Sequence, residues 1–188
     1  TVFISMVITL KRDERFDLRG HISNFGSIGI AYGGSALIAA LLHLTVQHSG
    51  LGVLLGALPV RTHWIDSREE VFPADLPLNV RCEHSEPVQG AVPLLEPGSR
   101  VLIMSFSHAE DLDIVAACLK RRRERADLPF IGLIGSKTKW ATFRHRLEAR
   151  GYDQAELDAV TSPIGVPGVV GKEPEVIAVA VAAQLMQQ

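Results

Sequence analysis

The hydrophobic and polar positions after residue 59 predict strands that alternate with helices. Apolar runs at 59–66, 100–106 and 130–134 have strand length, and the run at 100–106 is continuous, as in strands buried on both faces of a sheet. Apolar residues recur at helical spacing over 107–125 and 136–150. This alternation predicts an α/β fold, a parallel sheet with helices on both faces.

The other segments complete this outline. The amino-terminal apolar run, within 1–17, predicts a first strand, and a short strand is expected near Val80. Prolines and glycines predict a loop over 161–171, followed by a last helix from residue 173 with Pro174 in its first turn. The long uncharged run at 28–46 contains three glycines, which favours a Gly-rich turn and a buried helix over a membrane span.

Composition narrows the class of protein. A chain of 188 residues that is 47% hydrophobic and 21% charged suits one globular α/β domain. The net charge of −2 argues against a protein that coats nucleic acid. Cys82 and Cys118 have no metal-binding spacing, so we expect no metal site and a reducing, cytoplasmic location.

The topology predicts where a ligand binds. In open parallel sheets, ligands bind beyond the carboxyl ends of the strands. That rule selects the turn after the first strand and the segments 66–68, 105–111 and 135–139. The sequence shows no nucleophile–base set, so no catalytic residue is predicted.

A glycine turn precedes the strand at 59–66. Gly50 and Gly52 lead into a short helix, where backbone N–H groups approach a phosphate in dinucleotide folds. Asp66 closes the following strand at the position of a ribose-binding acid, and Arg68 suits a bidentate contact with phosphate. The alternatives are a structural tight turn for the glycines and a local surface salt bridge for Asp66 and Arg68.

His108 lies where the strand at 100–106 gives way to a helix. Ser107 is a good N-cap, and Glu110 is placed for a capping box with it, which is a purely structural interpretation. The topology nevertheless places His108 at the ligand side, where it suits a proton carrier or a hydrogen-bond donor.

Two lysines stand at the wrong end of a helix. Ser136 is the expected N-cap of the helix over 136–150, and Lys137 and Lys139 fall in its first turn. The helix dipole disfavours cations there, so we expect an anionic ligand to sit among them. The alternative is that both side chains point into water.

Four segments resemble the XdhC family of xanthine dehydrogenase accessory proteins. They read "WIDSREEVFP", "SHAEDLDI", "FIGLIGSKTKWATFRHRLEARG" and "TSPIGVPGVVGKEPEVIAVAVAAQL". The resemblance implies a Rossmann-like domain over 41–188, preceded by an N-terminal segment over 1–40 that is partial or degenerate. The chain departs from the family pattern before "WIDSRE", where members carry an "FGAGHVG"-type turn and this chain has "VQHSGLGVLLGAL".

The resemblance also implies a function. Members bind the molybdenum cofactor (molybdopterin), act as its chaperone while a cysteine desulfurase supports its sulfuration, and deliver it to xanthine dehydrogenase. The leading hypothesis is therefore a cytoplasmic binding and delivery protein, not an enzyme. Its cofactor-binding residues would be Gly50, Gly52, Asp66, Arg68, His108, Ser136, Lys137 and Lys139.

Two other hypotheses stay open. An NAD(P)-dependent oxidoreductase shares the glycine turn and Asp66, with His108 as the candidate proton donor. An interaction scaffold with a vestigial ligand site is the third. Neither nucleic acid nor membrane is an expected partner, and the apolar helices are compatible with a homodimer.

Overall fold

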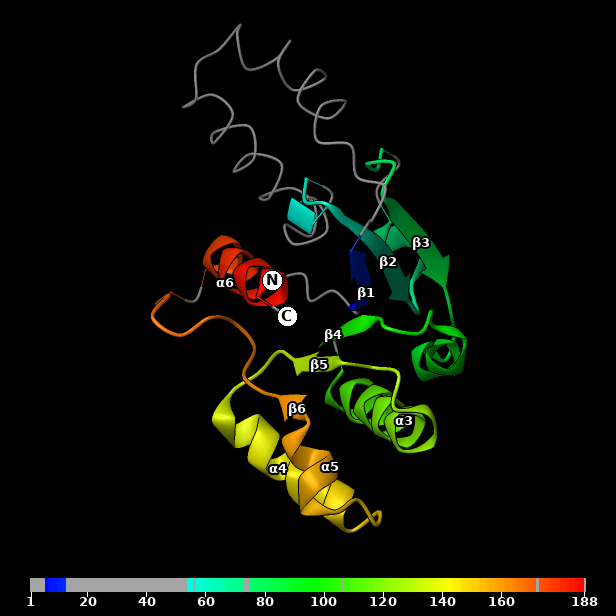
Figure 1. Ribbon diagram of the computed structural model, residues 1–188, viewed down its shortest axis with the longest axis vertical. Coiled ribbons are helices and arrows are strands. Elements are labelled where there is room, and N and C mark those ends of the chain that lie inside the picture. The colour runs from blue at the N-terminus through cyan, green and yellow to red at the C-terminus, as the bar shows by residue number, and fades with distance from the viewer. Residues whose placement is uncertain are drawn as a thin grey trace, which may run out of the picture.

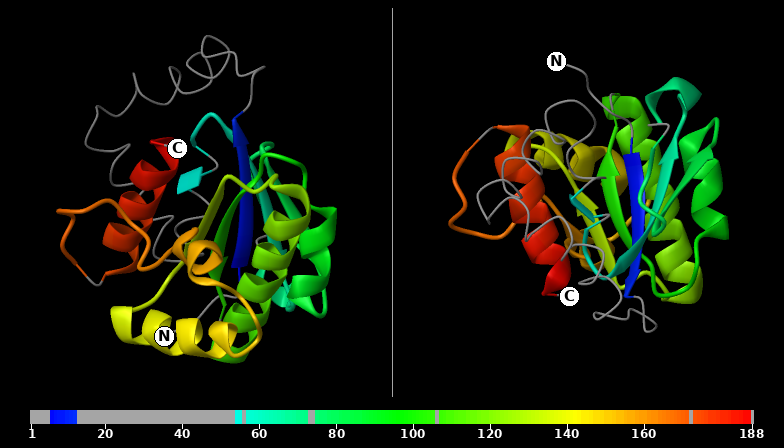
Figure 2. Two further views of the ribbon diagram at one scale, coloured as in Figure 1. Left: turned by 60° about the horizontal axis from the view of Figure 1, so that its bottom comes forward. Right: turned by 90° about the horizontal axis from the view of Figure 1, so that it is seen from above.

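The structure, a computed structural model, describes residues 6–12, 54–55, 57–72, 75–105, 107–171 and 173–187 (Figure 1). Gly50 and Gly52 lie outside these residues, as does the run at 28–46. The described part of the chain forms one sheet with helices on both faces (Figures 1 and 2).

The sheet has six strands in the order β3-β2-β1-β4-β5-β6. Their bounds are β1 Met6–Arg12, β2 Val60–Asp66, β3 Val80–His84, β4 Arg100–Met104, β5 Phe130–Leu133 and β6 Val160–Thr161. All of these strands except β1 run in the same direction, because β2 and β4 both pair antiparallel with β1 and the remaining pairs are parallel.

Helices cover the two faces of the sheet unequally. The α-helices are α3 His108–Arg125, α4 Lys137–Glu148, α5 Gln154–Asp158 and α6 Pro174–Met186, and the 3₁₀ helices are η1 Glu69–Val71 and η2 Val88–Leu94. α6 lies on one face of the sheet, whereas α3 and η2 lie on the other (Figure 2).

The central strand β4 is apolar after Arg100, because both of its faces are covered. Val101 and Ile103 belong to the core cluster that also contains residues of α3, α4 and η2, and Leu102 belongs to the cluster under α6. All three are fully buried. Successive side chains of a strand point to opposite faces, so a strand covered on both faces has no polar position to spare.

The predicted alternation of strands and helices is confirmed. The strands near 60, 80, 100 and 130 and the helices beginning near 107, 136 and 174 are all present. The pattern missed η1, η2, α5 and β6, which are short. Elements of this length carry too few residues for a hydrophobic period to show.

The first strand, β1, runs antiparallel to the other strands, so the sheet is not uniformly parallel as predicted. β1 is a strand, as expected, but Arg12 at its carboxyl end pairs with Val60 at the start of β2. The carboxyl end of β1 therefore lies at the edge opposite the carboxyl ends of the other strands, so the prediction that a ligand-binding turn follows β1 at the shared edge is wrong. An apolar run specifies a buried strand without specifying its direction, since both pairings satisfy the backbone.

A buried arginine anchors the end of α3. The Arg121 side chain is 3% exposed, and its Nε and Nη2 atoms donate to the two carboxylate oxygens of Asp127 at 2.9 and 2.6 Å. Its Nη1 donates to the carbonyl oxygen of Val92 in η2 at 2.7 Å. These hydrogen bonds from Arg121 hold the pKa of Asp127 below its usual value. The pair therefore joins α3, η2 and the segment that leads into β5.

We expect Asp127→Ala to lower the free energy of unfolding by about 2 kcal/mol at neutral pH, because it leaves a buried guanidinium without its partly exposed partner. The contribution of Asp127 is complete above its unfolded pKa of 3.8 and is lost as the pH falls through its lower folded value. Urea denaturation at neutral and acid pH measures this. Asp158→Ala, in an exposed pair with Arg144, is the control and should change stability by less than about 0.5 kcal/mol. Equal effects of the two substitutions would contradict the anchoring role of Arg121.

Candidate functional site

Three strand-end turns meet at one edge of the sheet. We define the carboxyl edge as residues 66–68, 105, 107–111 and 134–139, which follow β2, β4 and β5. Contacts join the three segments: the Ser67 hydroxyl donates to Glu110 at 3.1 Å, and the Lys139 ammonium lies 2.5 Å from the Asp111 carboxylate. The parallel direction of β2, β4 and β5 brings together segments that lie up to about seventy residues apart.

Asp66 and Arg68 form a salt bridge inside the turn after β2. Asp66 has no exposed surface, and its Oδ1 accepts hydrogen bonds from the Arg68 backbone N–H at 3.0 Å and from Arg68 Nε at 3.2 Å. Burial raises the pKa of Asp66, and the hydrogen bonds from Arg68 oppose that rise. The local salt bridge that the sequence left open is therefore present, but its carboxylate is buried rather than on the surface.

Ser67 connects the ends of β2 and β3 with α3. Besides the hydrogen bond from its hydroxyl to Glu110, its carbonyl oxygen lies 3.1 Å from Nε2 of His84, the last residue of β3. The sequence pattern assigned Glu110 to a capping box, whereas its carboxylate accepts from Ser67. Ser67 lies within the predicted segment 66–68, although it was not named as a site residue. His84 was not predicted, although it is the last residue of a strand, which is the signal that selected Asp66.

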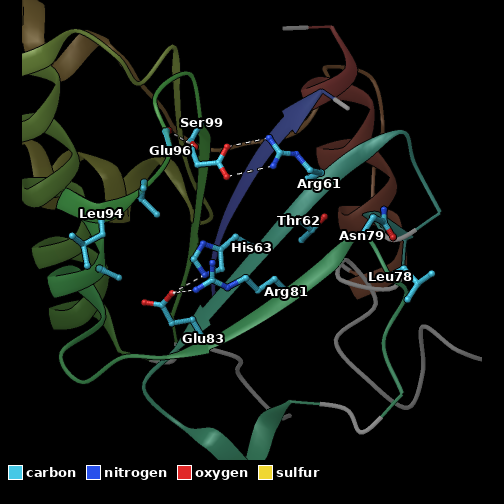
Figure 3. A pocket seen from close by; sticks show the side chains of 12 residues that line it. Arg61, Thr62, His63, Leu78, Asn79, Arg81, Glu83, Leu94, Glu96 and Ser99 are labelled. Atoms are coloured by element: carbon cyan, nitrogen blue, oxygen red, sulfur yellow. Dashed lines mark hydrogen bonds and ion pairs between the residues drawn. The ribbon is translucent and has the colours of Figure 1, made fainter. Parts of the chain in front are cut away.

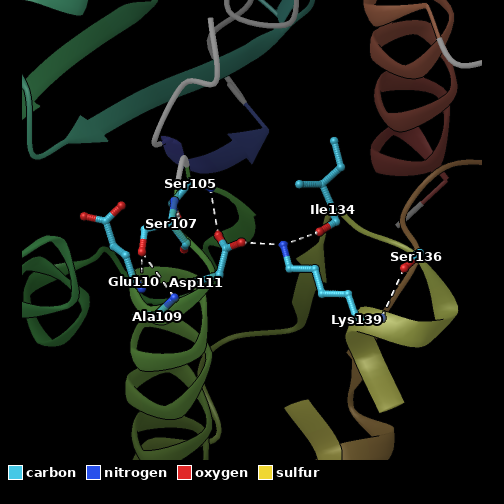
Figure 4. Close-up of polar contacts among 8 residues, drawn as sticks. All are labelled: Ser105, Ser107, Ala109, Glu110, Asp111, Ile134, Ser136 and Lys139. Atoms are coloured by element: carbon cyan, nitrogen blue, oxygen red, sulfur yellow. Dashed lines mark hydrogen bonds and ion pairs between the residues drawn. The ribbon is translucent and has the colours of Figure 1, made fainter. Parts of the chain in front are cut away.

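The turn between β4 and α3 is held by its own serines. Ser107 is the N-cap of α3, as predicted, and its hydroxyl accepts from the N–H groups of Ala109 and Glu110 at 3.2 and 3.5 Å (Figure 4). Ser105 donates its hydroxyl to the Ser107 carbonyl oxygen at 2.6 Å. His108 is exposed, and its ring stands edge-on to the Phe143 ring of α4, with centroids 6.3 Å apart.

The two lysines at the start of α4 differ in their surroundings. Ser136 is the N-cap, as predicted, and accepts from the Lys139 N–H at 3.1 Å. Lys139 is 11% exposed, and its ammonium donates to Asp111 and to the Ile134 carbonyl oxygen (Figure 4). Lys137 is exposed and makes no ion pair with another described residue. The Asp111 carboxylate thus compensates the charge of Lys139 within the chain. Lys137 is the lysine that still favours an anionic ligand at the start of this helix.

Asp111 is the carboxylate that sequence reasoning missed. It has no exposed surface, and its Oδ1 accepts from the Ser105 N–H at 2.7 Å. In the sequence it is one of several acids in the first turns of α3, a placement that the helix dipole already explains. Nothing in that pattern distinguishes a buried acid from an exposed one.

A separate cleft lies away from the carboxyl edge, on the face of β2 and β3 beside η2 (Figure 3). Its volume is about 340 Å³, and its lining contains the ion pairs Arg61–Glu96 and Arg81–Glu83. The predicted cofactor-binding residues Asp66, Arg68 and His108 do not line it. Its charged side chains are paired with one another (Figure 3), which leaves no clear preference for the charge of a ligand.

Among the described residues, no group of three or more His, Cys, Asp or Glu side chains is arranged to hold a metal ion. In the same part of the chain, no helix combines the length and apolar character needed to cross a membrane.

We expect the free energy of unfolding of the wild type to fall relative to that of the Asp66→Asn variant as the pH rises from about 3 to about 7. The pKa of Asp66 in the folded protein lies above the 3.8 of the unfolded chain, so only the wild type loses stability as the pH rises through that interval. Urea denaturation at several pH values measures the difference. Asp75→Asn, which replaces an exposed carboxylate, is the matched control. A difference that moves in the opposite direction would mean that Arg68 more than offsets the burial of Asp66.

Comparison with known proteins supplies the family. No curated protein matches the chain. The family model described as the XdhC Rossmann domain matches residues 47–185, which include β2 to β6 and the whole carboxyl edge. Because this match spans well over half of the 188 residues, the chain belongs to the XdhC family and carries its Rossmann domain.

Proposed function

We propose that this protein is a molybdenum cofactor-binding accessory factor for xanthine dehydrogenase. It would protect the cofactor, support its sulfuration by a cysteine desulfurase and deliver it to the dehydrogenase in the cytoplasm. Membership of the XdhC family supports the accessory role. The observation that carries the proposal for this chain is the convergence of the turns after β2, β4 and β5, which places the half-buried Glu110 and the exposed His108 and Lys137 along one edge.

The start of α4 suits the phosphate group of the cofactor. Lys137 is exposed, and the first N–H groups of a helix have no partner within the helix. A phosphate beside them would meet a cation and the positive end of the helix dipole at once. Lys139 would contribute through its place in the fold, since its ammonium already contacts Asp111 and Ile134 and its N–H donates to Ser136.

The other half of the carboxyl edge suits the pterin. Glu110 is a half-buried carboxylate in the first turn of α3, and a pterin ring presents N–H donors to such an acceptor, whereas Asp66 would contribute by holding Arg68 at the edge. His108, exposed beside Phe143, would line the opening between the two halves. These residues bind and orient a ligand, and the proposal assigns no covalent step to them, so the protein would have no turnover of its own.

The dinucleotide alternative uses the same edge. An NAD(P)-dependent oxidoreductase would place a ribose on Asp66, yet each carboxylate oxygen of Asp66 already accepts from Arg68. Calorimetry with NAD(P) separates the two functions, because tight binding without pterin retention would favour the oxidoreductase.

We expect Lys137→Gln to lower pterin retention by about three- to tenfold, because it removes the exposed cation at the start of α4. The protein is purified from cofactor-producing cells, the pterin is released by oxidation, and its fluorescence is measured per mole of protein. The melting temperature should not change, since Lys137 pairs with no described residue.

Lys120→Gln is the matched control. Lys120 is also exposed, but by the helical rise it lies about 18 Å along α3 from His108, the first residue of that helix. Its substitution should leave the pterin yield unchanged. Equal yields from the wild type and Lys137→Gln would remove Lys137 from the site, and a wild type without pterin would reject the proposed function.

A further inference from the structure

The Asp111–Lys139 pair connects the backbones of two turns at the carboxyl edge. Asp111 accepts from the N–H of Ser105, directly after β4, and Lys139 donates to the carbonyl oxygen of Ile134, directly after β5. The N–H of Ile134 in turn donates to Ile103 in β4 at 3.0 Å. The carboxylate–ammonium contact therefore joins the β4–α3 turn to the β5–α4 turn, in addition to the hydrogen bond between Ile134 and Ile103 (Figure 4).

Neighbouring residues leave Lys139 little freedom. Gly135 has a φ of +156°, and a Cβ at this position would lie 2.6 Å from Cδ of Lys139, so a larger residue would displace the lysine side chain. The ammonium lies 5.5 Å from the centroid of the Phe143 ring, within the range of a cation–π contact. Phe143 also contacts the edge-on ring of His108. The placement of His108 is thus connected to the ion pair through one aromatic side chain.

The two lysines of the "GSKTK" segment consequently have different roles. The Lys139 ammonium contacts Asp111, Ile134 and the ring of Phe143, and its side chain is 11% exposed. Lys137, two residues earlier, is exposed. The Lys139 side chain is therefore part of the structure of the carboxyl edge, and the Lys137 side chain is available to a ligand.

We infer that Asp111 and Lys139 are positioning residues of the ligand site. They hold the two turns in one arrangement, so that the start of α4, Lys137 and His108 face the ligand together, while their own charges neutralise each other. The inference rests on the proposed function for the identity of the ligand, but the geometry of the two turns is testable without it.

The test compares Asp111→Asn, Lys139→Met and the double variant in the full chain. Each single variant should lower both the melting temperature and pterin retention, the latter by about tenfold. The double variant has no unpaired buried charge, so its melting temperature should recover toward that of the wild type. Its retention should stay low, because a thioether side chain in place of the Lys139 ammonium cannot donate to Ile134, and the β5–α4 turn loses that hydrogen bond. Recovery of both properties would overturn the inference and leave the pair a purely structural contact.

Amide hydrogen exchange provides the readout that needs no ligand. In the unliganded single variants, exchange in peptides covering 103–108 and 133–138 should become faster than in the wild type, whereas exchange in α5 should not change. Unchanged exchange at both turns would overturn the positioning role. A wild type that retains no pterin, together with faster exchange in the variants, would reject the proposed function while supporting the positioning of the turns.

Discussion

The contact between Asp111 and Lys139 is the interaction on which the carboxyl edge depends. Neither group is freely hydrated, since Asp111 is fully buried and Lys139 nearly so. Removing two charges from water costs several kcal/mol per ion, so such a pair adds little net stability, but a single remaining partner is strongly destabilising. The pair therefore constrains geometry more than it stabilises the fold, and it acts on two turns that face the proposed ligand.

The two buried acids of the carboxyl edge are each paired with a cation. Asp66 is held by Arg68 after β2, and Asp111 is held by Lys139 between α3 and α4. Both acids are buried, and both are fixed by hydrogen bonds from a nearby backbone N–H. The edge thus presents a rigid framework with few mobile charges, and Lys137 stands out on it as an exposed cation at the positive end of a helix. A framework of this kind is compatible with the proposed binding and delivery of a cofactor.

Much of the fold was predictable because it follows from local patterns. The continuous apolar run of β4 and the helical period of Trp140, Phe143 and Leu147 both indicated which faces are buried. The N-caps Ser107 and Ser136 were predictable because capping is a contact between residues two or three positions apart. The direction of β1 was not, since an apolar strand satisfies its hydrogen bonds in either orientation.

The candidate site was predictable in outline only. Strand ends and the topology rule were enough to select Asp66, Arg68, His108 and the "GSKTK" segment, and family resemblance supplied a ligand for them. The partner of Lys139 is 28 residues away, and no local signal separates Asp111 from the other acids of α3. The same limit applies to Ser67 and Glu110, which are 43 residues apart.

The sequence by itself determined the alternation of strands and helices, the caps, and the placement of two cations at the start of a helix, because these depend on neighbours along the chain. Only the tertiary structure decided that one of these cations is neutralised from another helix and the other is exposed. That outcome depends on the distance between α3 and α4, which the packing of both helices around the sheet determines and no local pattern encodes.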